Sequence, residues 1–313
     1  MGAGTLSSRA IIGEFYKTLE TDPGANWIGP LSMLFTSDQD SETYPWLGQS
    51  PAMREWIGGR NAKGFRENGI TIANKHFEST IEVLVSELRR DKTGQILTRI
   101  RELAARTNSH WASLLSTLIL NGTSALCYDG HAFFDTDHSE GDSGTQDNDL
   151  TCDISALPAS VHGVVTAPSV EEMQQTILKA VSAIFGFKDD VGEPMNEGAR
   201  SFLAMVPVSL YLVAAKAVSL PIGTGVSEQN VPADLNISVV PNARLTWTDS
   251  LAVFRTDGNV KPFIRQQETE VMLKAKAEGS EFEFDNDAHQ YGVDAWRNVG
   301  YGYWQHACYI QMT

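Results

Sequence analysis

One apolar repeat, between residues 93 and 121, constrains the fold of this 313-residue chain more than any other feature. Its large apolar side chains follow the spacing of one helix face: Ile96, Ile100, Leu103, Trp111, Leu114 and Leu118. The Asn-Gly pair at 121–122 is a typical helix stop. At ~1.5 Å per residue such a helix exceeds ~35 Å. The repeat therefore predicts a domain built along one long helix.

A second unit is predicted to begin near Pro168, where Ser169 and Glu172 match the capping box of a helix. The apolar face of that helix is Val170, Met173, Ile177, Val181 and Ile184. Beyond it, "RSFLAMVP" predicts a buried strand and "VSLYLVAAKAVSL" a helix. Further strands are predicted at "LNISVVPN", "SLAVFRT", "KPFIRQ", "TEVMLKAK" and the aromatic "YGVDAWRNVGYGYWQHACYIQ".

Residues 1–45 are typical of an arm that precedes the body of a domain. Within "SSRAIIGEFYKTLE", Ser8 is the expected N-cap of a helix with Ile11, Ile12, Phe15 and Leu19 on one face. This face must be covered by the body of the same subunit or by a neighbour. A polar connector, "TSDQDSET", follows the helix.

Glycine pairs and alternating residues predict a long β-hairpin or extended loop at about residues 50–77. Loops of this length in compact proteins are usually functional or disordered. After it, "STIEVLVSEL" alternates Ile81, Val83 and Val85, which predicts a strand, although a helix also fits.

The charge of the chain is unevenly distributed. The whole chain carries −15 with a pI near 4.8, which argues against tight wrapping of nucleic acid. Residues 54–106 nevertheless hold eleven Lys and Arg against seven Asp and Glu. Residues 107–178 hold ten acidic residues and no Lys or Arg. Either a positive element of one subunit lies on a negative surface of another, or the acidic stretch is simply solvated.

The remaining composition indicates a soluble chain made in a reducing cytoplasm. Three cysteines without a CxxC spacing cannot all pair, which favours free thiols: Cys127, Cys152 and Cys308. No signal peptide and no apolar run near the ~18 residues of a membrane span are visible.

The stretch "YDGHAFFDTDH", residues 128–138, concentrates histidine and aspartate and raises the possibility of a metal-dependent hydrolase. Its possible ligands are His131, Asp135, Asp137 and His138. Their spacing matches no sharp zinc pattern. The alternative is an architectural loop, with a turn at 129–130, Phe133 and Phe134 buried, and the two later aspartates accepting backbone N–H bonds. No nucleophile elbow, P-loop or dinucleotide fingerprint is present, so we assign no catalytic, metal or cofactor residue.

Several motifs, taken together and in order, resemble the major head subunits of Mu-like bacteriophages and prophages. They are "YPWLG…MREWIGGR" leading to "IANKHFESTIEV", "YDGHAFFDTDH" after the long helix, and the closing "YGVDAWRNVGYGYWQHA". The resemblance extends from about Gly13 to Ile310. It implies an α+β chain with the tailed-phage major capsid fold of Hong Kong 97 type. That fold has an N-terminal arm, an extended E-loop, a peripheral domain with a long spine helix, and an axial domain.

The resemblance also implies a division of the chain. The expected parts are the N-terminal arm at 1–45, the E-loop and its base at 46–80, the peripheral domain with the spine helix at 81–164, the axial domain at 165–285, and a return strand to the peripheral domain at 286–313. Because only about 45 residues precede the E-loop, we expect scaffolding to come from a separate protein. Lys63 lies where some relatives crosslink, but no acceptor is identified and no crosslink is assigned.

The implied function is structural: a major capsid subunit that self-assembles, as hexamers and pentamers, into an icosahedral shell. The shell would enclose double-stranded phage DNA without sequence-specific binding, and a scaffolding protein, a portal and a decoration protein are the further partners. Its place would be the virion capsid, assembled in the bacterial host cytoplasm, with no membrane and no cofactor. The candidate inter-subunit contacts are Trp46, Arg54, Trp56, Arg60, Lys63 and Arg66. The alternatives are the hydrolase above and an encapsulin-type compartment shell.

Overall fold

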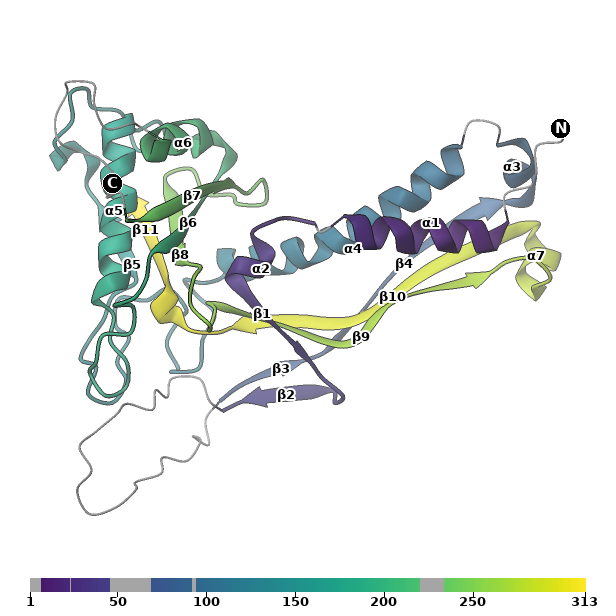
Figure 1. Cartoon of the computed structure of the whole chain (residues 1–313), viewed down its shortest axis with the longest axis horizontal. Coiled ribbons are helices and arrows are strands. Elements are labelled where there is room, and N and C mark those ends of the chain that lie inside the picture. The colour runs from purple at the N-terminus through teal and green to yellow at the C-terminus, as the bar shows by residue number, and fades with distance from the viewer. Residues whose placement is uncertain (1–6, 23, 46–68, 92–93, 220–233) are drawn as a thin grey trace, which may run out of the picture.

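The long helix of the sequence is the backbone of the elongated part of the molecule (Figure 1). In a computed structural model of the chain it is α4, Gln95–Leu120, 26 residues, with Asn121 as its C-cap. The structure describes residues 7–22, 24–45, 69–91, 94–219 and 234–313. Among these, no helix is long and apolar enough to cross a membrane.

Two sheets lie at opposite ends of the molecule (Figure 1). The four-stranded sheet beneath α4 has the order β1 (Ser32–Thr36), β9 (Phe263–Lys276), β10 (Ala288–Tyr301) and β4 (Lys75–Leu84). The five-stranded sheet has the order β5 (Asp149–Cys152), β11 (Ala307–Met312), β8 (Ser250–Arg255), β6 (Ser201–Val206) and β7 (Asn236–Pro241). A separate pair joins β2 (Ser41–Tyr44) to β3 (Ile70–Ala73), antiparallel.

The other helices pack on these sheets or at their ends. They are α1 (Ser8–Thr21), α2 (Ile28–Leu31), α3 (Val85–Arg90), α5 (Val170–Gly186), α6 (Tyr211–Ser219) and α7 (Glu281–Asn286). Helix α5 begins with the predicted capping box, since the Ser169 hydroxyl and the Glu172 carboxylate each accept the backbone N–H of the other residue.

Buried side chains form two separate clusters. The distal core, at the far end of the elongated part, consists of Ile11, Phe15, Val83, Leu88, Ile96, Ile100, Leu103, Ala104, Leu273, Tyr291 and Val293. The main core, around the five-stranded sheet and the near end of α4, includes Leu115, Phe133, Ile177, Phe202 and Trp304. Helix α4 and strand β10 contribute to both clusters, so they join the two ends of the molecule.

The apolar face of the N-terminal helix is covered by the body of its own subunit. Ile11 and Phe15 are fully buried in the distal core, with Ile12 and Leu19 partly buried beside them. Helix α1 lies along α4 (Figure 1). Its N-cap is Ser7 and not the expected Ser8, whose hydroxyl instead makes a 2.8 Å hydrogen bond with that of Tyr291.

The expected buried face of α4 is correct in the first half of the helix and wrong in the second. Leu115 and Ile119 are buried there, whereas Leu114 and Leu118 are only partly buried. The face changes because the first half packs into the distal core and the second half into the main core. One straight line of apolar residues along the whole helix therefore does not describe its buried face, because the two halves pack against different cores.

Long-range pairing changes three further predictions. "KPFIRQ" and "TEVMLKAK" are one 14-residue strand, β9, because β10 pairs with it along its length. The polar connector contains β2, which pairs with β3. "STIEVLVSEL" is a strand up to Leu84 and a helix from Val85, which settles its ambiguity.

The domain ranges stay a prediction, and the two sheets draw on more than one of them. Strand β9, inside the range 165–285, belongs to the four-stranded sheet together with β1 of the expected arm. Strand β10 of the closing range pairs with β4 and β9. Strand β11, in the same range, lies instead between β5 and β8.

Candidate functional site

The loop at 128–138 leaves the end of α4 and is anchored by two buried rings. Phe133 is fully buried and stacks on Tyr301 with ring centroids 4.6 Å apart. Phe134, 1% exposed, packs against Tyr309 of β11 at 5.5 Å. Asn148 holds the loop from the other side, because its amide donates to the Phe133 carbonyl and its side-chain oxygen accepts from the Asp135 N–H. The predicted burial of the two phenylalanines is therefore confirmed.

Asp129 is the centre of a buried hydrogen-bonded cluster in this loop. Its carboxylate accepts from His138 Nδ1 at 2.6 Å, from the Cys127 thiol at 2.9 Å and from the His131 backbone N–H at 3.1 Å. The His138 ring is fully buried and lies flat on Trp304, with centroids 3.9 Å apart. The cluster ties the loop to the segment that precedes β11.

The protonation states of Asp129 and Cys127 fit a structural role for this cluster. Burial raises the pKa of Asp129, but the hydrogen bonds from His138 and Cys127 outweigh burial and hold that pKa below its ordinary value. Burial, and then the Asp129 carboxylate, raise the pKa of the Cys127 thiol far above its ordinary value. Cys127 therefore stays a protonated donor, and a protonated thiol is not a nucleophile.

The four residues proposed as hydrolase ligands do not converge on one point. His131 Nδ1 lies 3.9 Å from the Asp135 carboxylate, and Asp137 is exposed. Asp135 accepts backbone N–H groups from Ala132 and Asp137, as the architectural alternative predicts. Asp137 does not confirm its half of that prediction, because no hydrogen bond to its carboxylate is recorded within the described part of the chain.

A different trio comes closer to a metal-ligand arrangement. Donor atoms of Cys127, Asp129 and His138 all lie within 4.8 Å of one another. Their hydrogen-bonded contacts of 2.6 and 2.9 Å are shorter than the ~3.3–3.8 Å that separates two ligands of a tetrahedral zinc. The trio therefore fits mutual hydrogen bonding better than it fits a shared ion.

The acidic stretch after the loop gathers negative charge on the surface. Burial, followed by the charges of Asp147 and Asp135, raises the pKa of Asp149 to about 6. The charges of Asp147 and Asp135 thus oppose the ionisation of Asp149 in addition to its burial. The candidate contact residues that would meet this surface lie outside the described residues: Trp46, Arg54, Trp56, Arg60, Lys63 and Arg66.

Two arginines at the junction of the two cores, one buried and one half-buried, were not found by sequence reasoning. Arg297 of β10 is 4% exposed, donates to the Thr107 carbonyl at 3.1 Å, and lies 4.9 Å over the Trp111 ring. Arg265 of β9 lies 5.5 Å over the same ring. Burial lowers the pKa of Arg297 to about 10. The only signal in the sequence was that Arg297 lies inside the aromatic closing stretch that predicts a strand.

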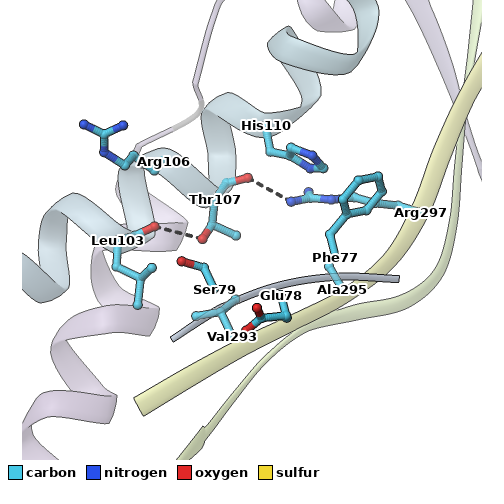
Figure 2. A pocket seen from close by; sticks show the side chains of 10 residues that line it. All are labelled: Phe77, Glu78, Ser79, Leu103, Arg106, Thr107, His110, Val293, Ala295 and Arg297. Carbon is cyan, nitrogen blue, oxygen red and sulfur yellow. Dashed lines mark hydrogen bonds between the residues drawn. The ribbon is translucent and has the colours of Figure 1, made fainter. Parts of the chain in front are cut away.

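A pocket of about 160 Å³ opens beside this junction, between α4, β4 and β10 (Figure 2). Phe77 and His110 meet edge to face at 4.4 Å on one side of it. Burial, followed by the charges of Arg297 and Arg244, lowers the pKa of His110 to about 4, so this imidazole is neutral at neutral pH. The arrangement offers packing and hydrogen bonding but no nucleophile with an adjacent base.

A match to a protein-family model assigns the chain to a family. The model of the Mu-like prophage major head subunit gpT matches residues 9–156 and 226–313, which together exceed half of the chain. The chain belongs to this family. The resemblance inferred from the motifs is thereby confirmed.

Individual relatives agree with this assignment. The chain is 33% identical over 111 residues to the Mu-like prophage FluMu major head subunit of Haemophilus influenzae, covering 36% of each chain. It is 32% identical over 108 residues to the major capsid protein of Escherichia phage Mu, covering 34% of this chain and 35% of that one. The aligned stretches thus span about a third of the length of these relatives.

A solved structure shows the fold. The subunit in the procapsid of bacteriophage JBD30 superposes with a TM-score of 0.57 at 23% identity, over 96% of this chain and 72% of that chain. The α+β architecture of a tailed-phage major capsid protein, inferred from the motifs, is therefore confirmed.

Proposed function

We propose that this family member is the shell-forming subunit of a phage head. The observation that carries the proposal is the family match, together with a fold shared with a procapsid subunit over nearly the whole chain. Many copies, as hexamers and pentamers, would build an icosahedral virion capsid around double-stranded DNA. A net charge of −15 supports enclosure without tight adhesion, because DNA is also strongly negative.

We infer further partners from the same reasoning. A separate scaffolding protein, a portal and a decoration protein would complete the head, and assembly would take place in the bacterial host cytoplasm. No enzymatic activity, metal or cofactor is part of the proposal. The histidine and aspartate loop supports this, because its Asp129 carboxylate is engaged by hydrogen bonds from His138, from Cys127 and from the His131 backbone.

The proposed physical basis of assembly is charge pairing between subunits. Residues 54–66 carry four basic residues against one glutamate, and the stretch 107–178 carries ten acidic residues and no Lys or Arg. The raised pKa of Asp149 supports an acidic surface that a positive segment of a neighbour would stabilise. Each such contact is weak, but every subunit makes several, so closure of the shell is cooperative.

Reversal of the basic segment tests this proposal. Changing Arg54, Arg60, Lys63 and Arg66 to Glu places like charges together at the contact, which costs several kcal/mol. We expect a soluble variant with normal circular dichroism that forms no particles in sedimentation or electron microscopy. A matched control changes the same four residues to Lys or Arg, which keeps the charge. Normal closed shells from the reversed variant would refute the assignment of this segment.

The encapsulin-type alternative makes a different prediction for purified particles. Phage heads should contain DNA when they are taken from infected or induced cells, whereas a compartment shell should contain protein cargo. Nuclease-protected DNA in the particles supports the phage-head function, and its replacement by a packaged protein would contradict it.

A further inference from the structure

The tip of the elongated part carries an exposed aromatic side chain within an acidic helix. Phe284 of α7 is 91% exposed, the largest exposed fraction recorded for a large hydrophobic residue in the described chain. Residues 277–288 carry five acidic residues and no basic one. Covering a ring this exposed would remove apolar surface from water, which would favour its contact with another surface.

The faces of α7 are used differently. On the inner side, the Phe282 ring lies under the Lys276 ammonium at 5.9 Å, and Glu283 accepts from His289 at 3.0 Å. Glu281 and Asp285 are exposed, and helical spacing places both on the side of Phe284. Glu281, Phe284 and Asp285 therefore form one outward surface, the acidic knob.

Helices α3 and α4 meet at the same end of the molecule (Figure 1). Residues of both helices line a hollow there. It has a volume of about 260 Å³ and is lined by Glu87, Arg90, Asp91, Gln95, Ile96 and Arg99. Arg90 and Arg99 are exposed, and no ion pair is recorded for either within the described residues. The lining itself holds two arginines and two carboxylates, but residues 86–101 carry five basic and two acidic residues, so the region around this hollow, the basic socket, is net positive.

We propose that the acidic knob of one subunit docks into the basic socket of a second copy of this chain. The phenyl ring would enter the hollow against Ile96 and the arginine stems, with cation–π contact to a guanidinium. Glu281 and Asp285 would pair with Arg90 and Arg99. The acidic knob and the net positive region around the socket are complementary in charge, and within one subunit the Phe284 ring and the side chains of Arg90 and Arg99 are exposed.

The positions of knob and socket on one subunit determine how copies associate. The Val85 N–H at the start of α3 donates to the carbonyl of Asp287, just after α7, at 2.9 Å, so the two surfaces belong to one tip. The contact joins unlike surfaces, so a pair of bound copies keeps one knob, on one copy, and one socket, on the other, available. Such a heterologous contact closes into a ring of tips when the rotation between copies permits it.

A charge-swap experiment tests the pairing in the full-length chain. The knob reversal is Glu281→Lys with Asp285→Lys, and the socket reversal is Arg90→Glu with Arg99→Glu. We expect each reversal to lower the yield of particles about tenfold or more, measured by sedimentation, and the fourfold combination to restore most of it. Phe284→Ser should also lower the yield, and Phe284→Leu, which keeps an apolar side chain, should retain more of it.

Two results would overturn the pairing. One is a normal yield from either reversal alone, and the other is a fourfold variant as defective as its two halves while circular dichroism shows folded subunits. The proposal rests on the shell function, and the wild-type chain separates the two ideas. If the wild type forms no particles, the shell function fails; if it forms them but the reversals have no effect, only this contact fails.

Crosslinking provides a second measurement that does not depend on loss of assembly. All three native cysteines are buried, so Phe284→Cys with Gln95→Cys introduces the accessible thiols among the described residues. Mild oxidation of particles should give a ladder of covalent multimers, whereas Phe284→Cys with Glu20→Cys, on an exposed site of α1, should not. Crosslinks within single subunits only, or to another protein, would overturn the proposal.

Discussion

The distal core and the main core stabilise the molecule in different ways. Eleven buried residues form the distal core in the described chain, and they come from three helices and three strands of the elongated part. The main core surrounds a five-stranded sheet and holds most of the large buried rings, including Phe133, Phe202 and Trp304. A small cluster loses a larger share of its contacts with each deleted side chain, so the distal end should open first.

The largest expected effect concerns Phe15, the fully buried ring that α1 contributes to the distal core. Phe15→Ala should cost ~3–5 kcal/mol through lost burial and a cavity. We expect hydrogen exchange to accelerate in α1 and the first half of α4, with little change in β6 and β8.

The matched change in the main core is Phe133→Ala, which removes an equally buried ring. It should accelerate exchange across the five-stranded sheet. If Phe15→Ala loosens β6 and β8 as much as α1, the two cores form one cooperative unit and the comparison fails.

A second prediction sharpens the place where α4 passes from one core to the other. Leu115 is fully buried in the main core, whereas its neighbour Leu114 is only partly buried. Leu115→Ala should lower the free energy of unfolding by ~2–5 kcal/mol, and Leu114→Ala by less than ~1.5 kcal/mol. Chemical denaturation of unassembled subunits measures both. Equal costs would show that the buried face does not turn between the two halves of the helix.

The smallest expected effect concerns pH and the loop that closes the main core. Because the pKa of Asp129 is lowered by folding, its charged form stabilises the native state above the ordinary aspartate pKa of ~3.9. That contribution is lost as the pH falls through the lowered pKa. Asp129→Asn should cost ~1.5–3 kcal/mol at pH 7, because hydrogen bonds to a charged group are lost.

The difference between wild type and Asp129→Asn should therefore shrink as the pH is lowered below ~4. Denaturation curves at pH 7 and pH 3 measure it, with the exposed Asp137→Asn as a control that should show little difference at either pH. A gap that is constant between the two pH values would show that Asp129 is not charged in the native state.

Local features of the sequence predicted the elements that depend on local interactions. The extent of α4, the capping box at Ser169 and the apolar face of α1 follow from helical spacing and capping, which act within a few residues. The burial of Phe133 and Phe134 followed from their apolar character alone. The family resemblance added the fold class, which periodicity by itself does not specify.

The features that sequence reasoning missed depend on partners far along the chain. The union of two segments into β9 requires β10, and the shift from Leu114 to Leu115 requires knowledge of which core each half of α4 enters. The cluster around Asp129 was not predicted either, although its members lie close in sequence. The fold of the loop backbone determines which donors reach the Asp129 carboxylate, and the spacing of residues in the sequence does not reveal that fold.

The continuity of α4 has a mechanical consequence. Its 26 residues contain neither glycine nor proline, the residues at which helices most often bend, so the helix acts as a stiff strut between the two ends of the subunit. The strands turn from one sheet toward the other at Gly300 and Gly302, where an added Cβ would lie 2.3 Å from Ile72 Cδ1 and 2.5 Å from the Lys261 carbonyl oxygen, respectively. A larger side chain at either glycine would therefore force the turn between the two ends of the subunit to shift.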